Sequence, residues 1–408
     1  MLIRIIITPQ KSLNIDVMQE LFLTCPGGLE TICENELKTI GILNTRIKPG
    51  GVSIFGEEET IFKINLWTRT GVRLLVKIDH FECRNKNELY QGVHQIDWNS
   101  IFTTQNTFSV NGFFRSEDES LRNTHYATLV CKDAIVDRFK KECNSRPDVN
   151  KLDPQFHIFV HVHHNRGTVY LNSSGSPLYK RGYRRGKMHK ASMNEALAAG
   201  IMLLTGWNGS TPLYDPMCGS GTLSIEAMMI AANYAPGLIR SKFAFMNWKF
   251  FDPHDWNNLI SNAKDSIKRQ IKPEIFASDI RRDAIQMAKE NYRNIRDLSH
   301  SIMWDVQSVT DLEPDENPGM IVMNPPYGER TGEMESLKIL YKGIGDMLKT
   351  NCQGYSAYLF TASSELMKQV GLKTSRRIPL RNGNLECRLL KYDLYAGSKK
   401  GKYMDNKS

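Results

Sequence analysis

The chain has 408 residues, of which 41% are hydrophobic, and it carries a formal net charge of +9 at pH 7. This length predicts two or three domains with buried cores, and the basic balance is consistent with contacts to phosphate groups. No apolar run approaches the roughly 20 residues that cross a bilayer. The opening Met1–Thr8 is too short and too soon polar for a signal peptide, so nothing in the sequence indicates a membrane protein.

The cysteines and histidines give no metal-site signature. The eight cysteines show neither a CxxC pair nor the spacing of metal ligands. We therefore expect reduced thiols, a cytoplasmic location and no bound metal. His161 and His163 alternate along a predicted strand and share one face of it. They could form a metal pair, but a polar sheet face is the interpretation we favour.

Residues 21–79 predict a small α+β unit that follows a tail of residues 1–20. A turn at Pro26–Gly28 leads into the first helix, and helical and strand-like patterns then succeed one another. The predicted elements are a helix at Leu29–Lys38, strands near Thr45–Ile47 and Gly51–Phe55, and a helix near Glu58–Leu66.

Residues 80–175 predict a second α+β unit. Its expected elements are an alternating strand at Thr107–Arg115, a helix at Tyr126–Lys141, and two strands within Phe156–Asn172 joined by a turn at Asn165–Gly167. Candidate contacts to RNA in this unit are Arg115, Arg122 and Lys132, although each of them taken alone is more often a solvated charge.

A change of composition at Asn172–Pro177 predicts the boundary to a third unit, residues 176–396. This unit begins with a basic stretch, Tyr179–Lys190, which holds six Lys or Arg, two tyrosines and no acid. Basic residues interleaved with aromatic ones suit RNA, and a disordered basic linker is the alternative. The candidate contacts to RNA in this stretch are Lys180, Arg181, Arg184 and Arg185.

From residue 211 onward, strand and helix patterns alternate, which predicts a doubly wound sheet of parallel strands. A helix at Ala191–Thr205 precedes it, and a polar helical insertion at Trp248–Gln270 interrupts it. The later elements are a helix at Glu335–Lys349, a strand at Gly354–Thr361, and a hairpin over Arg376–Tyr395 that turns at Asn382-Gly383. The basic tail, residues 397–408, is expected to be disordered.

A glycine turn lies between the first strand of this unit and a helix at Leu223–Ala232. The strand ends at Asp215, and Gly219 and Gly221 follow, where they allow the backbone to approach a ligand closely. The turn has no Gly-Lys-Ser/Thr of a phosphate loop and lacks the third glycine of a dinucleotide site. An acid at this position suits a ligand with an amino-acid head, whose ammonium Asp215 can help position.

Three further polar residues end or follow apolar strand-like runs later in the chain. Asp279 closes the second strand, where an acid binds ribose hydroxyls. Asp305 ends the third, within reach of an adenine amine, and Asn324 follows the run Met320–Met323. Each alone is more often a turn or cap residue. Because parallel strands carry ligands at their carboxyl ends, we expect all of these residues to converge.

The stretch Asn324-Pro325-Pro326-Tyr327 predicts methyl transfer to a base nitrogen. The prolines keep the backbone extended and stiff, and the carbonyl groups of Asn324 are then free to accept hydrogen bonds from an exocyclic amine. Tyr327 offers a face on which a base that is unpaired or flipped can stack. The chemistry needed is positioning and electrostatics, with no metal and no covalent enzyme intermediate.

Together, Asp215–Thr222 and Asn324–Arg330 resemble class I S-adenosylmethionine-dependent RNA methyltransferases that modify guanine N2. The likeness extends from about Leu21 to Tyr395 and is strongest to the bacterial 23S ribosomal RNA guanine-N2 methyltransferases. It implies an α/β fold, with a Rossmann-like doubly wound catalytic domain preceded by a ferredoxin-like subdomain and a THUMP RNA-binding domain.

The resemblance also assigns site residues. The cofactor-binding set it implies is Asp215, Pro216, Cys218, Gly219, Gly221, Thr222, Asp279, Ile280, Asp305 and Asn324. The catalytic set is Asn324, Pro325, Pro326 and Tyr327, with the Pro325 carbonyl assisting Asn324. Glu329 and Arg330 complete the family motif and shape its loop. Glu195 occupies a family position that either lines the site or serves packing.

The expected reaction is therefore methyl transfer from S-adenosylmethionine to the N2 atom of a guanine in 23S rRNA. A tRNA guanine-N2 methyltransferase is the first alternative, because THUMP domains also serve tRNA modification. A DNA adenine methyltransferase would leave the N-terminal half without a role. The remaining alternative is an RNA-binding protein with a vestigial cofactor site. Some relatives carry a second methyltransferase domain; none is expected here, and neither is a second modification.

Overall fold

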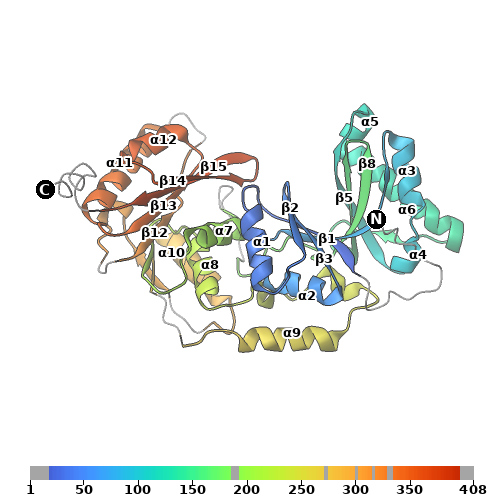
Figure 1. Ribbon diagram of the computed structural model, residues 1–408, viewed down its shortest axis with the longest axis horizontal. Helices are drawn as coiled ribbons and strands as arrows, with labels where there is room; N and C mark the ends of the chain where they lie inside the picture. The colour runs from blue at the N-terminus through green and yellow to red at the C-terminus, as the bar shows by residue number, and fades with distance from the viewer. Residues whose placement is uncertain are drawn as a thin grey trace.

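The computed structural model describes residues 18–184, 193–270, 274–298, 302–314, 318–328 and 334–395. It is elongated, with an eight-stranded sheet at one end and a seven-stranded sheet at the other (Figure 1). Among the described residues no helix is both long enough and apolar enough to cross a membrane. Residues 1–17 of the predicted N-terminal tail, the predicted tail 397–408, Arg185, Glu329 and Arg330 fall outside these ranges. The N-terminal tail was predicted to extend to residue 20, but Gln19 and Glu20 already belong to the first strand.

The N-terminal half forms one sheet with the strand order β2-β3-β1-β4-β8-β7-β5-β6. Its strands are β1 (Gln19–Thr24), β2 (Thr45–Lys48), β3 (Gly51–Gly56), β4 (Arg73–Glu82), β5 (Thr107–Arg115), β6 (Asp148–Val149), β7 (Phe156–His163) and β8 (Arg166–Asn172). The predicted boundary after residue 79 falls inside β4, which pairs with β1 on one side and β8 on the other. The two predicted units therefore share a strand.

The helices of this half are α1 (Glu30–Thr39), α2 (Glu58–Trp67), α3 (Lys86–His94), α4 (Trp98–Ile101), α5 (Glu119–Arg122) and α6 (Thr124–Cys143). Asn123 caps α6 by accepting a hydrogen bond from the Tyr126 amide, and Asn144 ends it in the left-handed conformation. The β7–β8 turn consists of His164 and Asn165, both with positive φ, so it starts one residue earlier than predicted.

The C-terminal half is the predicted doubly wound sheet, in the order β11-β10-β9-β12-β13-β15-β14. The parallel strands are β9 (Leu213–Asp215), β10 (Ile275–Asp279), β11 (Met303–Val306), β12 (Met320–Met323) and β13 (Ser356–Thr361). An antiparallel hairpin of β14 (Arg376–Asn382) and β15 (Leu385–Asp393) completes the sheet. It turns through Gly383 at φ +60°, as the Asn-Gly pair predicts.

Helices cover both faces of this sheet. Residues of α7 (Glu195–Thr205), α8 (Thr222–Ala231) and α10 (Arg282–Arg293) enter the core on one face, and those of α11 (Met334–Thr350) and α12 (Ser364–Gln369) enter the core on the other. The helices predicted over residues 191–205, 223–232 and 335–349 are therefore present, with ends shifted by a few residues. The described residues also form short 3-10 turns, η1 (Pro236–Ile239), η2 (Ala244–Asn247) and η3 (Val309–Asp311).

The insertion between α8 and β10 ties the two halves together. It contains α9 (Pro253–Asp265), which runs beneath the N-terminal sheet in Figure 1. Its rings Phe245 and Trp256 lie 4.9 and 6.3 Å, centroid to centroid, from Phe62 on α2. The insertion was predicted from its polar helical pattern alone, and its role in joining the two halves becomes evident only in the structure.

The predicted domain boundary at Asn172–Pro177 is an ordered, buried joint. Asn172 Nδ2 donates to the carbonyl of Gly175 at 2.7 Å, and Ser174 Oγ donates to Asn65 Oδ1 at 2.7 Å. Serine and asparagine are common in flexible linkers, but here their polar groups are used to satisfy one another in the interior. The two halves are therefore held by specific contacts.

Candidate functional site

The carboxyl edge of the seven-stranded sheet gathers the predicted polar residues. Asp215 and Asp279 are the last residues of β9 and β10, and Asn324 directly follows β12. Asp305 is the third of four residues in β11 and lies opposite Ser278 in the neighbouring strand. Since β9 to β12 are parallel, their carboxyl ends meet at one edge, and the four side chains lie along it.

Asp215 is a buried acid whose two carboxylate oxygens differ in their hydrogen bonding. Its Oδ2 accepts a hydrogen bond from Ser224 Oγ at 2.7 Å, while its buried Oδ1 has no partner among the described residues. Burial, with a smaller contribution from Asp279, raises the pKa of Asp215 to about 7. A desolvated carboxylate with a free lone pair fits a cationic donor such as the ammonium of an amino acid.

The glycine turn leads directly into the N-terminus of α8. Gly221 precedes the helix at φ +78°, and a Cβ there would approach Trp304 Cη2 to 2.9 Å and Ala288 Cβ to 3.0 Å. Gly219 has φ +54° and open space beside it, so at this position the backbone conformation alone requires glycine. The Gly219 amide donates to Asp279 Oδ2 at 3.0 Å, so the second strand holds the turn in place.

Apolar side chains are exposed around the other two acids. Ile280, immediately after Asp279, is 70% exposed, and Met303 and Val306 on β11 are also exposed. Asp305 accepts a hydrogen bond from the Val306 amide at 2.8 Å and remains open to solvent. An exposed apolar surface beside two carboxylates fits a purine nucleoside, with the ring on the apolar groups and the hydroxyls and amine on the acids.

Asn324 presents a second unused acceptor. Its buried Oδ1 has no hydrogen-bond partner among the described residues. Pro325 is buried, whereas Pro326 is exposed, so only the first of the two prolines is covered by the rest of the protein. A buried amide oxygen without a partner is costly, so this oxygen is available to a ligand that donates a hydrogen bond to it.

Tyr327 is fixed by a residue that the sequence did not single out for this role. Asn382 Nδ2, at the β14–β15 turn, donates to the Tyr327 hydroxyl at 3.1 Å. Asn382 was predicted only as a turn residue. No local pattern could have connected it to Tyr327, because the two residues are 55 positions apart.

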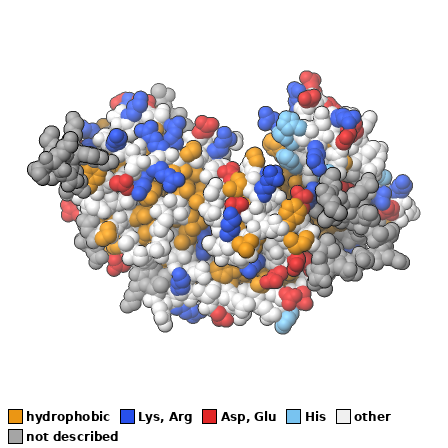
Figure 2. Space-filling model, in the orientation of Figure 1, with side chains coloured by type: hydrophobic (Ala, Val, Ile, Leu, Met, Phe, Trp, Pro, Cys, Tyr) orange, Lys and Arg blue, Asp and Glu red, His pale blue; other side chains and the backbone are white. Residues whose placement is uncertain are grey.

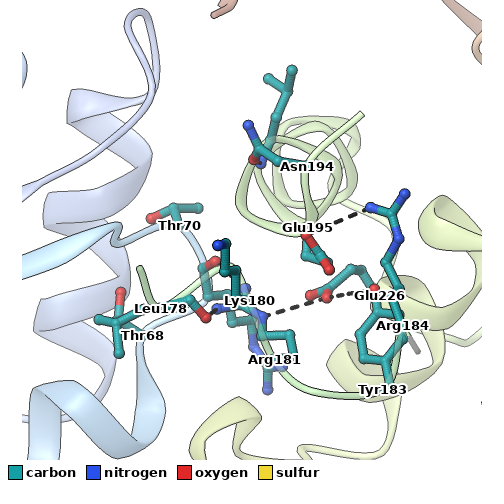
Figure 3. Close-up of polar contacts among 12 residues, drawn as sticks. Thr68, Thr70, Leu178, Lys180, Arg181, Tyr183, Arg184, Asn194, Glu195 and Glu226 are labelled. Atoms are coloured by element: carbon teal, nitrogen blue, oxygen red, sulfur yellow. Dashed lines mark hydrogen bonds and ion pairs between the residues drawn. The ribbon is translucent and has the colours of Figure 1, made fainter. Parts of the chain in front are cut away.

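Two of the predicted RNA contacts lie in the interior (Figure 3). Arg181 is 1% exposed: it donates to the carbonyls of Leu178 and Arg69, and its Nε lies 3.5 Å from Glu226 Oε1. Tyr183 also donates to Glu226 Oε1, at 3.2 Å. The prediction that Arg181 contacts RNA is therefore wrong, because a carboxylate of α8 already compensates its charge.

The prediction that Arg184 contacts RNA is wrong for the same reason. Its side chain is almost fully buried, with Nη1 donating to the Met193 carbonyl at 2.9 Å and lying 3.6 Å from Glu195 Oε2. Glu195 is buried in turn, and this burial raises its pKa. Of the two interpretations considered for Glu195, these contacts support packing. Lys180 remains exposed.

The predicted contacts in the N-terminal half remain at the surface. Arg115 is exposed, and the exposed Arg122 donates to the carbonyls of Ser116 and Glu117. Lys132, paired with Asp133 at 2.7 Å, borders a hollow of about 840 Å³ between this half and the insertion. The hollow is also lined by Arg73, Lys151 and Lys242 and by one acid, Asp153, which pairs with Lys242 at 2.8 Å, so basic side chains outnumber acidic ones on its rim.

Comparisons with known proteins agree with this architecture. Residues 181–391 match the RMKL-like methyltransferase domain, residues 20–75 the RlmL ferredoxin-like domain, and residues 83–172 the THUMP domain. The predicted order of domains is thus confirmed.

The curated relatives support the same assignment. A protein of Synechocystis named "Putative RNA methyltransferase" is 36% identical over 92% of this chain and 96% of its own length. The "Ribosomal RNA large subunit methyltransferase K/L" of Psychromonas ingrahamii is 37% identical over 92% of this chain, which spans half of that relative.

Solved structures complete the comparison. A "putative methyltransferase complexed with SAH" superimposes with a TM-score of 0.83 at 28% identity, over 93% of this chain and 99% of that one. A "possible methylase" from Clostridium difficile superimposes with a TM-score of 0.83 at 30% identity, over 94% of this chain and 100% of that one. The unpartnered buried Oδ1 of Asp215 fits the ammonium group of such a cofactor. The chain belongs to the RMKL-like family of S-adenosylmethionine-dependent methyltransferases.

Proposed function

We propose that the protein methylates the exocyclic N2 atom of a guanine in large-subunit ribosomal RNA. The observation that carries this proposal is the partnerless buried acceptor, Asn324 Oδ1, at the edge where the cofactor-type residues converge. The THUMP match and the named activity of the Psychromonas relative support RNA, and specifically ribosomal RNA, as the substrate.

Different residues of this chain would bind different parts of the cofactor. S-adenosylmethionine, when bound, supplies an activated methyl group. Asp215 holds the ammonium of its amino-acid end, Asp279 the ribose hydroxyls and Asp305 the adenine amine, while Ile280 covers the purine ring. The amino-acid end of the cofactor would also contact Pro216, Cys218, Gly219, Gly221 and Thr222.

The target base would be held by the residues after β12. Asn324 Oδ1 and the Pro325 carbonyl accept hydrogen bonds from the guanine amine, which orients its lone pair for attack. Tyr327 stacks on the base, and the hydrogen bond from Asn382 keeps the ring in place. Catalysis then rests on orientation and charge complementarity.

The direct test is incubation with labelled S-adenosylmethionine and separately purified 23S rRNA, tRNA and duplex DNA, followed by nucleoside mass spectrometry. N2-methylguanosine in 23S rRNA alone would support the proposal. The same nucleoside in tRNA alone would move the substrate to tRNA. Methyladenine in DNA, or no product on any of the three, would contradict the proposal.

Cofactor affinity is expected to depend on the charge of Asp215. Its pKa of about 7 means that the carboxylate is lost as the pH falls through 7, so the dissociation constant for S-adenosylhomocysteine should be roughly tenfold higher at pH 6 than at pH 8. Equilibrium dialysis at both pH values measures this. The Asp215→Asn variant should bind S-adenosylhomocysteine weakly at both pH values. A wild-type affinity that does not change with pH would contradict the role proposed for Asp215.

We also propose a cytoplasmic location. All eight cysteines are free, and seven of them are buried thiols. A protein whose cysteines are all unpaired fits a reducing compartment, as does an RNA substrate.

A further inference from the structure

The THUMP part of the eight-stranded sheet has one open face. Helices α3 and α6 lie on one side of strands β5 and β8 (Figure 1), and the buried residues of β7 (Phe156, Ile158, Val160 and Val162) belong to the core on that side. The residues that alternate with them are His157, Phe159, His161 and His163, all partly exposed on the opposite face.

Four rings on this open face form a ladder, which we define as Phe113, His161, His163 and His164. Phe113 is 51% exposed and stacks on His161 with the ring centroids 5.6 Å apart and the planes 14° from parallel. His161 stacks on His163 at 6.0 Å and 19°, and His164 meets His163 edge-on at 4.0 Å. The strand pairing fixes this order, because Phe113 on β5 lies opposite His161 on β7.

The geometry of His161 and His163 does not suit the metal pair considered from the sequence. Their rings are nearly parallel, and parallel rings side by side do not direct their nitrogens to one point, as metal ligands must. Within the described ranges no group of three or more His, Cys, Asp or Glu side chains could hold a metal ion. Of the two interpretations made from the sequence, the structure favours the polar sheet face.

The charge around the ladder is one-sided. Strands β5, β7 and β8 contain no Asp or Glu, whereas Arg115 and Arg166 lie opposite His163 on its two neighbouring strands. The nearest acid across the sheet is Glu82, opposite Arg166 on β4. Burial lowers the pKa of His161, and burial and His164 lower that of His163, which favours the uncharged form of both rings. The face thus combines uncharged aromatic rings with a cationic rim.

Figure 2 shows a notch between the THUMP end and the catalytic end of the molecule, with histidine side chains on the wall that the THUMP end presents to it. This notch differs from the hollow of about 840 Å³ described above, which none of the four ladder residues lines. A polynucleotide that delivers a base to the catalytic edge could therefore lie along this wall.

We propose that the ladder is a stacking platform for unpaired nucleotides of the RNA substrate, separate from the site of the methylated base. Planar rings stack on exposed aromatic side chains whatever their sequence, and arginines beside them bind the phosphates. Duplex RNA holds its bases inside the helix, so its phosphates can contact the arginines but its bases cannot stack on the ladder. This proposal rests on the proposed function, because it names the form of RNA that the THUMP sheet binds.

The test compares a fluorescein-labelled 12-nucleotide single-stranded RNA with a 12-base-pair RNA duplex, using fluorescence anisotropy at one fixed salt concentration. The full chain is used, with Phe113→Ala and His161→Ala. Each substitution should weaken binding of the single strand at least about fivefold and change duplex binding less than about twofold. Phe113→Tyr keeps the aromatic face and should restore single-strand binding.

Controls separate stacking from folding. Ile339→Ala removes another exposed apolar side chain, from α11 in the catalytic half, and it should leave both affinities unchanged. Equal losses on single strand and duplex, no loss at all, or a Phe113→Tyr variant as weak as Phe113→Ala would overturn the platform.

Methyl transfer distinguishes failure of this proposal from failure of the proposed function. On an RNA that the wild type methylates, Phe113→Ala should raise KM for RNA and leave kcat and the affinity for S-adenosylhomocysteine unchanged. If the wild type methylates no RNA but shows the single-strand preference and its loss in Phe113→Ala, the proposed function fails and the platform stands.

Discussion

Replacing Asn324 with alanine is expected to reduce the rate of methyl transfer at least about a hundredfold. Asn324 Oδ1 is a buried acceptor without a partner, directly after β12, and in our proposal it orients the amine that is methylated. Alanine removes this acceptor and leaves the two prolines that stiffen the loop. Cofactor and RNA binding should stay nearly intact, because Asp215, Asp279 and the basic surface are untouched.

Single-turnover transfer of labelled methyl groups to RNA measures the chemical step, and calorimetry with S-adenosylhomocysteine measures cofactor binding. Asn382→Ala is a milder companion variant, because it removes one hydrogen bond to the Tyr327 hydroxyl without touching Asn324. It should cost less activity than Asn324→Ala. A near-normal rate for Asn324→Ala would show that the catalytic assignment is wrong, and a matching loss of cofactor affinity would place Asn324 mainly in the cofactor site.

The second large effect is expected on stability. Glu226→Gln should destabilise the protein by about 3–5 kcal/mol, because it removes the charge that compensates the buried Arg181. Arg69, also buried, interacts electrostatically with the same carboxylate. Burial raises the pKa of Glu226, and the two arginines act against that rise, so the carboxylate and its cations depend on one another.

Urea-induced unfolding followed by tryptophan fluorescence gives the change in stability. Glu386→Gln is the matched control: Glu386 also pairs with an arginine, Arg381, at 3.5 Å, but both side chains are more than half exposed. Its effect should stay within about 1 kcal/mol. If Glu226→Gln is as mild as this control, Glu226 is already protonated in the folded protein and its charge does not hold the cluster.

The cluster also joins the two halves of the molecule. Arg181 donates to the carbonyl of Arg69 in the N-terminal half and pairs with Glu226 on α8, the helix that begins at the glycine turn. The loop that presents Arg69 is held by Glu36, which accepts a hydrogen bond from Thr70 Oγ1 at 2.8 Å. A variant that loosens this cluster is therefore expected to disturb the catalytic and RNA-binding halves together.

Residues close together in the chain determined much of the site. Apolar runs that end in Asp215, Asp279 and Asn324 predict parallel strands, and parallel strands place their last residues at one edge. The glycine turn is equally local, since its backbone conformation is set by Gly219 and Gly221. These features depend on short-range sterics and on strand periodicity, which are readable in the sequence.

The basic stretch shows where the sequence alone was insufficient. Its composition is the same whether Arg181 is solvated, bound to phosphate or paired with a carboxylate 45 positions away, as it is here. Asn382 and Tyr327, and Phe113 and His161, are likewise brought together by strand pairing between distant segments. The sequence by itself determined the elements and the residues at their ends. Only the tertiary structure decided which distant side chains meet, because burial and long-range pairing depend on the whole packed chain.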